Sequence, residues 1–158
     1  MNFAGRHTFG VRQEELFQRL LDPAVLHDSI PGCEELVQTG EAAYSIRLSA
    51  GFGPIRGTFN GTVVLKDLIP PRSYTLELKG EGRTGFVSGL TRIALEPLDG
   101  GAATEIRFES EVQVGGLIAG VGARFIPGAA RNLSEQFFTS LEKAIEAQAG
   151  GAPGGKNP

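Results

Sequence analysis

A long alternation of apolar and polar residues in the middle of the chain constrains the fold more than any other feature. In residues 44–50 and 55–65 nearly every second position is apolar or glycine, and the positions between them are largely polar. Residues 74–78 and 104–110 repeat the pattern. Because successive side chains of a strand point to opposite faces, the pattern predicts strands with one apolar and one water-exposed face. We therefore expect residues 33–114 to form an antiparallel sheet.

A further strand and two short helices are expected before this region. Residues 2–10 alternate like a strand, and residues 13–21 carry their apolar side chains on one helical face. Asp22-Pro23 predicts the start of a second helix over 23–29, because aspartate caps a helix and proline suits its first turn.

One long helix is expected after the sheet. An apolar stripe at helical spacing predicts it over residues 115–148, with a kink at Pro127. Residues 149–158 are rich in glycine and proline and are expected to form a flexible tail. The sequence therefore predicts one domain, residues 1–148, followed by this tail.

Glycine is unusually frequent, with 23 in 158 residues, and many glycines lie inside the alternating segments. Glycine weakens a strand and marks bends or the close approach of a backbone or ligand. We predict an α+β fold, in which a curved antiparallel sheet of about seven strands wraps around the C-terminal helix and leaves a cavity. The glycines expected to bend the sheet are Gly51, Gly53, Gly57, Gly61, Gly80, Gly82, Gly85 and Gly89.

Charge and cysteine content exclude several classes of protein. The net charge is −3 and the basic residues are scattered, whereas nucleic-acid binding needs clustered positive charge. Cys33 is the single cysteine, so no internal disulfide is expected. We find neither the apolar core of a signal peptide nor the run of about 18 apolar residues that a membrane span needs, and we expect a cytoplasmic protein.

The sequence offers little for polar catalysis. His7, His27 and Cys33 do not lie at metal-ligand spacing, so no metal site is expected. Cys33 is expected to be a small residue at a bend, because no neighbouring cation or base is evident that would lower the pKa of its thiol. We therefore predict no catalytic residue and no covalently bound cofactor.

Apolar side chains on the expected inner faces predict the wall of a ligand cavity. The predicted lining residues are Phe59, Phe86, Leu90, Phe108, Leu117, Val121 and Phe125. Arg92 and Arg124 are the predicted polar handles for a ligand head group, with a solvated charge at the rim as the alternative. The glycine-rich segment 115–122 is expected to act as a gate, because few side chains hold it in place.

Several short motifs occur in a specific order along the chain. They are Asp22-Pro23, Ile30-Pro31-Gly32-Cys33-Glu34, Gly53-Pro54-Ile55-Arg56-Gly57-Thr58-Phe59-Asn60-Gly61, Gly80-Glu81-Gly82, Gly85-Phe86-Val87-Ser88-Gly89, Val114-Gly115-Gly116-Leu117 and Phe137-Phe138. Together, over residues 2–145, they resemble the CoxG family, which takes its name from a subunit of carbon monoxide dehydrogenase. The order of elements resembles the wider helix-grip (SRPBCC) superfamily, which includes the START lipid-transfer domains, the major birch-pollen allergen and the polyketide cyclases.

The resemblance implies a non-catalytic accessory protein of a molybdenum-containing CO dehydrogenase or related hydroxylase. It also implies a lipid or isoprenoid quinone held in the cavity, and coupling of the enzyme to the inner face of the membrane. Two other functions stay open. A cyclase- or hydratase-type enzyme would need an acid–base pair in the cavity, for which only His7 is suitably placed. A ligand-free assembly adaptor would have a sheet packed solid, with no cavity larger than a few waters.

Overall fold

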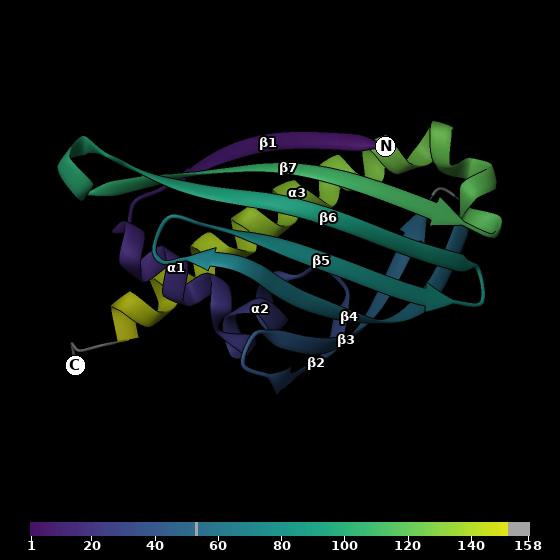
Figure 1. Cartoon of the computed structure of the whole chain (residues 1–158), viewed down its shortest axis with the longest axis horizontal. Coiled ribbons are helices and arrows are strands. Elements are labelled where there is room, and N and C mark those ends of the chain that lie inside the picture. Colours follow the sequence, from purple (N-terminus) through teal and green to yellow (C-terminus); the bar gives the residue numbers. More distant parts are fainter. Residues whose placement is uncertain (53, 152–158) are drawn as a thin grey trace.

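A sheet of seven antiparallel strands dominates the computed structural model, which describes residues 1–52 and 54–151 (Figure 1). The strands lie side by side in the order β1-β7-β6-β5-β4-β3-β2. Their bounds are Asn2–Phe9 (β1), Cys33–Gly40 (β2), Ala43–Phe52 (β3), Ile55–Ile69 (β4), Ser73–Gly82 (β5), Gly85–Leu98 (β6) and Ala103–Gly115 (β7). The alternating segments of the sequence form these strands, and the predicted α+β helix-grip fold is confirmed.

Two short helices carry the chain from one edge of the sheet to the other. α1 (Gln13–Leu21) and α2 (Pro23–Ser29) connect β1 to β2, the two edge strands. The backbone N–H of Ala24 donates to the Asp22 carboxylate at 3.0 Å, and Pro23 occupies the first turn, as predicted. A short 3₁₀ turn, η1 (Asp99–Gly101), joins β6 to β7. The long helix α3 (Leu117–Gly151) lies behind the sheet and crosses it diagonally (Figure 1).

The buried apolar core cluster lies toward one end of the sheet. There α1, α2 and the C-terminal half of α3 press their apolar faces against the inner face of the strands. The buried cluster consists of Phe9, Leu16, Phe17, Leu20, Val25, Tyr44, Leu65, Tyr74, Leu95, Ile106, Phe138, Leu141 and Ile145. The first half of α3 contributes none of these residues, so the other end of the sheet is packed differently.

The bounds of the long helix differ from the prediction. β7 continues to Gly115, and Gly116 turns the chain with a φ of +78° before α3 begins at Leu117. α3 continues to Gly151, beyond the predicted end at residue 148, and residues 152–158 of the predicted tail lie outside the described residues.

Pro127 lies inside α3 and does not end it. Figure 1 shows the first turns of α3 running in a different direction from the long remainder of the helix. A proline removes one backbone hydrogen bond and bends a helix, so the bend is the expected effect of this residue.

Candidate ligand-binding pocket

An apolar pocket lies between the inner face of the sheet and α3. It has two adjoining lobes of about 330 Å³ each. The distal lobe lies against Ile126 and Ala130 in the first half of α3, and the central lobe reaches Leu20 of α1 and Leu26 of α2. The two lobes share Leu48, Ala50, Phe108, Ser110, Leu133 and Ser134 as wall residues, and we call them together the interior pocket. A water occupies roughly 30 Å³, so each lobe exceeds a few waters.

Small residues keep the distal lobe open. Gly61 of β4 and Gly80 of β5 are direct partners in the sheet, and both line this lobe. A Cβ on Gly61 would lie 2.2 Å from the carbonyl oxygen of Lys79, so the close approach of β5 requires glycine there. A Cβ on Gly80 would lie 3.8 Å from its nearest neighbour, the carbonyl oxygen of Asn60, which is an ordinary van der Waals contact. Two of the glycines that were expected to bend the sheet therefore line the pocket, and their role in bending stays a prediction.

The polar side chains of the interior pocket are all hydroxyl groups. They belong to Tyr44, Tyr74, Thr91, Ser110 and Ser134. The Tyr44 hydroxyl donates to the carbonyl oxygen of Leu21 at 2.8 Å, and the hydroxyls of Thr91 and Ser110 lie 2.8 Å apart. Burial raises the pKa of Tyr74 and of Tyr44, which keeps both phenols neutral.

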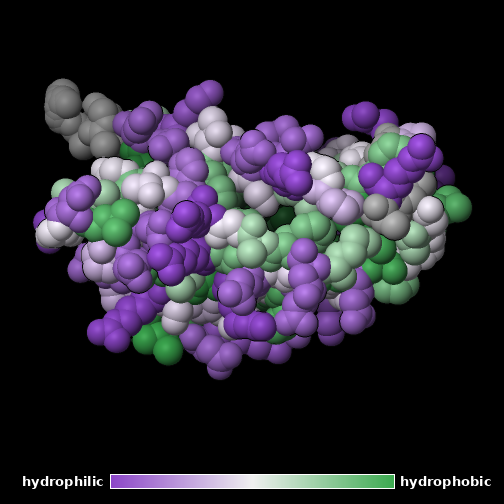
Figure 2. Space-filling model, turned by 90° about the horizontal axis from the view of Figure 1, so that it is seen from above, coloured by the Kyte–Doolittle hydropathy of each residue, from purple (hydrophilic) through white to green (hydrophobic). Residues whose placement is uncertain are grey.

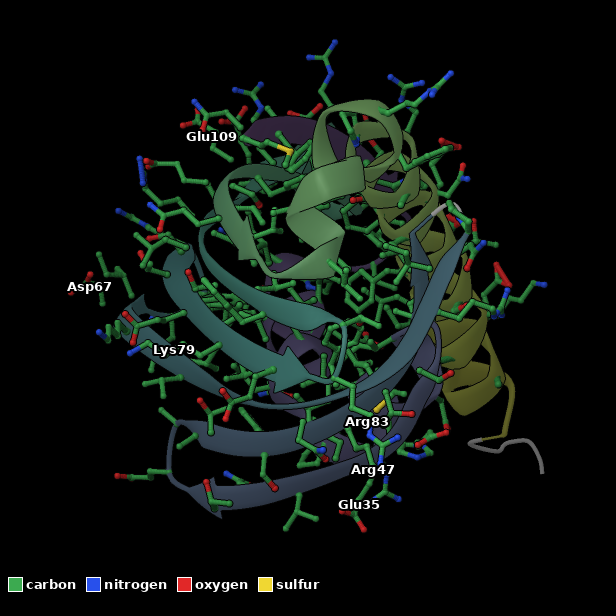
Figure 3. The ribbon with its side chains drawn as sticks, turned by 90° about the vertical axis from the view of Figure 1, so that its right-hand side faces the viewer. Glu35, Arg47, Asp67, Lys79, Arg83 and Glu109 are labelled. Atoms are coloured by element: carbon green, nitrogen blue, oxygen red, sulfur yellow. The ribbon has the colours of Figure 1, made fainter. Side chains whose placement is uncertain are left out.

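Charged side chains lie on the outer surface of the sheet. Among the described residues, no Asp, Glu, Lys, Arg or His lines either lobe of the interior pocket. Figure 3 looks along the molecule from its right-hand end and shows Asp67, Lys79 and Glu109 pointing away from the interior. The described wall of the interior pocket is therefore uncharged, while charged side chains lie on the outer face of the sheet.

The pocket opens at the seam between the edge strand β1 and α3. This seam holds a cleft of about 830 Å³, which shares Phe3, Phe108, Ala130 and Ser134 with the distal lobe. Figure 2 views the molecule from the side of β1 and shows a hollow with apolar walls among polar side chains. The distal lobe therefore adjoins a surface cleft along this seam.

His7 lies in the seam and not in the wall of the interior pocket. Its ring stacks on Phe138 with ring centres 5.2 Å apart, and its Nε2 lies 3.5 Å from a carboxylate oxygen of Glu142. The side chain on which the enzyme alternative depends is thus outside the two lobes.

The structure brings only part of the predicted lining together. Phe59 and Phe108 do lie in the wall of the pocket. Phe86 and Leu117 were placed wrongly, because their side chains are 50% and 65% exposed: Phe86 lies on the outer face of β6, next to the wall residue Val87, and Leu117 begins α3. Phe125 is half-buried but contacts neither lobe, and the side chain of Val121 lies outside the described residues. Whether any of these residues binds a ligand stays a prediction.

Leu90 and Arg92 were assigned to the wrong face of β6. The pocket wall contains Thr91 and Ile93, so the even-numbered neighbours point outward. The Arg92 guanidinium lies 3.2 Å from the Glu111 carboxylate on the neighbouring strand. Arg92 is therefore a solvated surface charge, the alternative given for it above. Arg124 is likewise exposed, with its guanidinium 5.9 Å from the Phe125 ring. Neither arginine is a polar handle of the interior pocket.

The actual polar groups, Thr91, Ser110 and Ser134, escaped prediction. The signal for Thr91 was present, because Arg92 and Glu96 mark the outer face of β6 and Ile93 and Leu95 the inner face. Extending that period of two backwards places Thr91 and Val87 inside. Ser110 follows from the alternation of residues 104–110, which places it on the same face as Ile106 and Phe108.

The remaining candidate groups offer no reactive centre in the described part of the chain. Burial raises the pKa of the Cys33 thiol, which makes it a poor nucleophile at neutral pH. The described residues contain no group of three or more His, Cys, Asp or Glu side chains that could hold a metal ion.

No helix within the described residues is long and apolar enough to cross a membrane.

The start of the proposed gate is more firmly held than expected. Ile118 is completely buried, and its backbone N–H donates to the carbonyl oxygen of Thr84 at 3.0 Å. A side chain on Gly116 would lie 2.6 Å from the backbone of Gly85, so its glycine serves close packing. Gating by segment 115–122 stays a prediction, and the side chains of residues 121–123 lie outside the described residues.

The sequence that forms this sheet and most of α3 matches one protein family. The family model for CoxG, a subunit of carbon monoxide dehydrogenase, matches residues 5–146. The chain belongs to the CoxG family. The resemblance seen in the motifs is therefore confirmed, and membership in this family supports a ligand-binding accessory role in general. A search of curated protein sequences found no match to the chain.

Solved structures agree with this CoxG-family assignment. The crystal structure of a conserved protein from Geobacillus kaustophilus is similar with a TM-score of 0.87 and 31% identity, covering 93% of this chain and 96% of that one. A START superfamily protein from Mycobacterium smegmatis has a TM-score of 0.69 at 12% identity, covering 93% and 98%. The Zhui aromatase/cyclase from Streptomyces sp. R1128 has a TM-score of 0.69 at 13% identity, covering 96% and 97%. At such low identity the last two establish the fold alone.

Proposed function

We propose that this chain holds a hydrophobic small molecule, a lipid or an isoprenoid quinone, in the interior pocket and serves a CO dehydrogenase-type molybdenum hydroxylase as an accessory protein. The observation that carries the binding part is the pocket itself, whose lobes of about 330 Å³ are walled almost entirely by apolar side chains. The partner enzyme is inferred from the family, which is described as a subunit of carbon monoxide dehydrogenase.

Binding is favoured over acid–base catalysis of the cyclase type. Such catalysis needs a His or carboxylate within reach of the reacting atoms, whereas the described walls of both lobes hold only hydroxyl groups as polar side chains. His7 lies in the seam and stacks on Phe138. We therefore propose a non-catalytic role, even though one protein of similar fold is described as an aromatase/cyclase.

A ligand-free adaptor is the less favoured alternative. It predicts a sheet packed solid against α3, with room for a few waters at most. The two lobes have more room than that. An apolar space of this size gains most from an apolar occupant, because water finds few hydrogen-bonding partners in it.

The test is organic extraction of the protein purified from its own host, followed by mass spectrometry. We expect a lipid or isoprenoid quinone in stoichiometric amount. Extraction of an empty protein, together with failure to bind added quinone or lipid, would contradict the proposal. Co-purification from the same host tests the second part, for which we expect a molybdenum hydroxylase to accompany the chain.

Contact with the membrane is the third part of the proposal, and one end of the molecule fits it. We define the apolar tip as the exposed side chains of Phe86 and Leu117, with the exposed Arg56, Arg83 and Arg124 on the neighbouring segments and the acidic Glu81 opposite Phe86 on β5. The segments that carry Leu117 and Arg83 contact each other, because the backbone N–H of Ile118 donates to the carbonyl oxygen of Thr84. The segment that carries Arg56 is also close, since a Cβ on Gly57 would lie 3.0 Å from the Thr84 hydroxyl. Residues 112–134 contain no acidic residue. Exposed apolar groups with arginines suit an anionic lipid surface.

We expect the double variant Leu117→Ser/Arg124→Gln to bind anionic vesicles about tenfold more weakly or worse, because one arginine near such a surface contributes about 1 kcal/mol and apolar insertion adds to it. Cosedimentation with phosphatidylcholine vesicles, with and without phosphatidylglycerol, measures the loss. Ile69→Ser is the matched control, since Ile69 is 55% exposed at the far end of β4. Equal binding by the double variant and the wild type would exclude the tip as the membrane contact.

A further inference from the structure

The hydroxyl groups of the interior pocket indicate which class of ligand it accepts. Thr91 on β6 and Ser110 on β7 are direct partners in the sheet, and their hydroxyl oxygens lie 2.8 Å apart. Both line the central lobe, and Ser110 also lines the distal lobe. The pair therefore stands where the two lobes meet, and Ser134 of α3 also lines both lobes.

This pair has hydrogen-bonding capacity left over. Each hydroxyl brings one proton, and the bond between them uses one of the two. The second proton remains available for a ligand oxygen, whichever of the two residues donates within the pair. Tyr44 differs, because its hydroxyl already donates to the carbonyl oxygen of Leu21. Thr91 and Ser110 thus present a neutral donor inside an otherwise apolar wall.

The neighbouring charges are kept away from this donor. Arg92 follows Thr91 and Glu111 follows Ser110, and these two charges pair with each other at 3.2 Å on the outer face of the sheet. None of the described residues that line the pocket carries a cationic side chain. A carboxylate or phosphate inside would lose its hydration without gaining a counter-charge, which strongly disfavours burial of such a group.

We infer that the interior pocket selects uncharged apolar molecules that carry a carbonyl or hydroxyl oxygen, that the Thr91–Ser110 pair binds this oxygen, and that fatty acids and other anions are rejected. The inference rests on the proposed function, since it names the head group of the ligand that the pocket holds. It assigns to Thr91 and Ser110 the role that was predicted for Arg92 and Arg124.

Three probes separate the possibilities: decyl methyl ketone and dodecanoic acid, which have the same number of carbons, and the larger hydrocarbon fluorophore diphenylhexatriene. We expect the protein to bind diphenylhexatriene, and the ketone to displace it at neutral pH with at least about tenfold higher affinity than dodecanoate. In the double variant Thr91→Val/Ser110→Ala, the affinity for the ketone should fall about three- to tenfold, the usual range for one lost neutral hydrogen bond. Binding of diphenylhexatriene by this variant should not change.

Thr75→Val is the matched control. Thr75 is partly buried on the neighbouring strand β5, and it is the sheet partner of Arg92, on the outer face. This variant should bind the ketone like the wild type. Equal affinity for ketone and dodecanoate, or unchanged ketone binding by the double variant, would overturn the inference. Binding of diphenylhexatriene in those cases would still support the proposed function, whereas a wild type that binds none of the three probes would contradict both.

Discussion

The variant Gly80→Leu is expected to remain folded and to lose at least about tenfold in affinity for diphenylhexatriene, a loss of about 1.4 kcal/mol. Gly80 lines the distal lobe, and a Cβ at this position would find its nearest neighbour, the carbonyl oxygen of Asn60, at 3.8 Å. A leucine side chain therefore extends into the empty lobe without displacing backbone. It occupies the space that the ligand needs, and fluorescence titration measures the loss.

The control for this variant is Lys79→Leu. Lys79 precedes Gly80 on β5 and points away from the interior in Figure 3, so a leucine there adds apolar surface without entering the pocket. We expect wild-type affinity from it. Circular dichroism and urea unfolding confirm that both variants are folded. If a folded Gly80→Leu protein binds the probe normally, the distal lobe is not the binding site.

The fold was predictable because its strands are amphipathic. In β3, Tyr44, Ile46, Leu48 and Ala50 were expected on one face, and all four line the interior pocket. One face of this antiparallel sheet contacts the core and the other contacts water. Apolar and polar residues therefore alternate along each strand, and this alternation is visible in the sequence. The start of α2 was predictable for a local reason, because Asp22 caps the helix whatever the rest of the chain does.

The lining was predictable only where that period is clear. Phe59 and Phe108 lie on cleanly alternating strands and were placed correctly in the pocket wall. β6 is less clean, because Leu90 lies on its outer face while Thr91 faces the pocket. A phase that places Leu90 inside also places Arg92 inside, so the two predictions are wrong for the same reason.

Other parts of the site depend on tertiary contacts that local pattern does not contain. Leu117 is a large apolar residue next to a buried one, Ile118, but its side chain is 65% exposed, whereas Phe86 follows the period of β6 to the outer face, where its ring lies over its sheet partner Gly115. The position of α3 relative to the sheet decides which residues are enclosed. Whether a cavity remains between α3 and the sheet depends on all the side chains of the inner face together. Gly61 and Gly80 line the distal lobe alongside aromatic rings.

α3 contacts both the buried core cluster and the interior pocket. We therefore expect two of its leucines, one in each place, to contribute very differently to stability. Leu141 is completely buried in the core cluster, whereas Leu133 is 37% exposed and faces both lobes of the pocket. We expect Leu141→Ala to lower the free energy of unfolding by about 2–5 kcal/mol, because it removes buried contacts and leaves a cavity. Leu133→Ala should cost less than about 1 kcal/mol, since part of its surroundings is already empty or solvent.

Urea unfolding of the ligand-free protein measures both free energies under the same conditions. The two substitutions remove the same atoms from the same helix, so differences in helix propensity cancel and the packing of each site remains. A similar cost at both positions would mean that side chains are packed as tightly around Leu133 as around Leu141. That result would contradict the presence of an open interior pocket beside Leu133. Added ligand should stabilise the wild type, and the Leu133 variant should lose part of that gain, because a ligand in the interior pocket contacts the side chain it lacks.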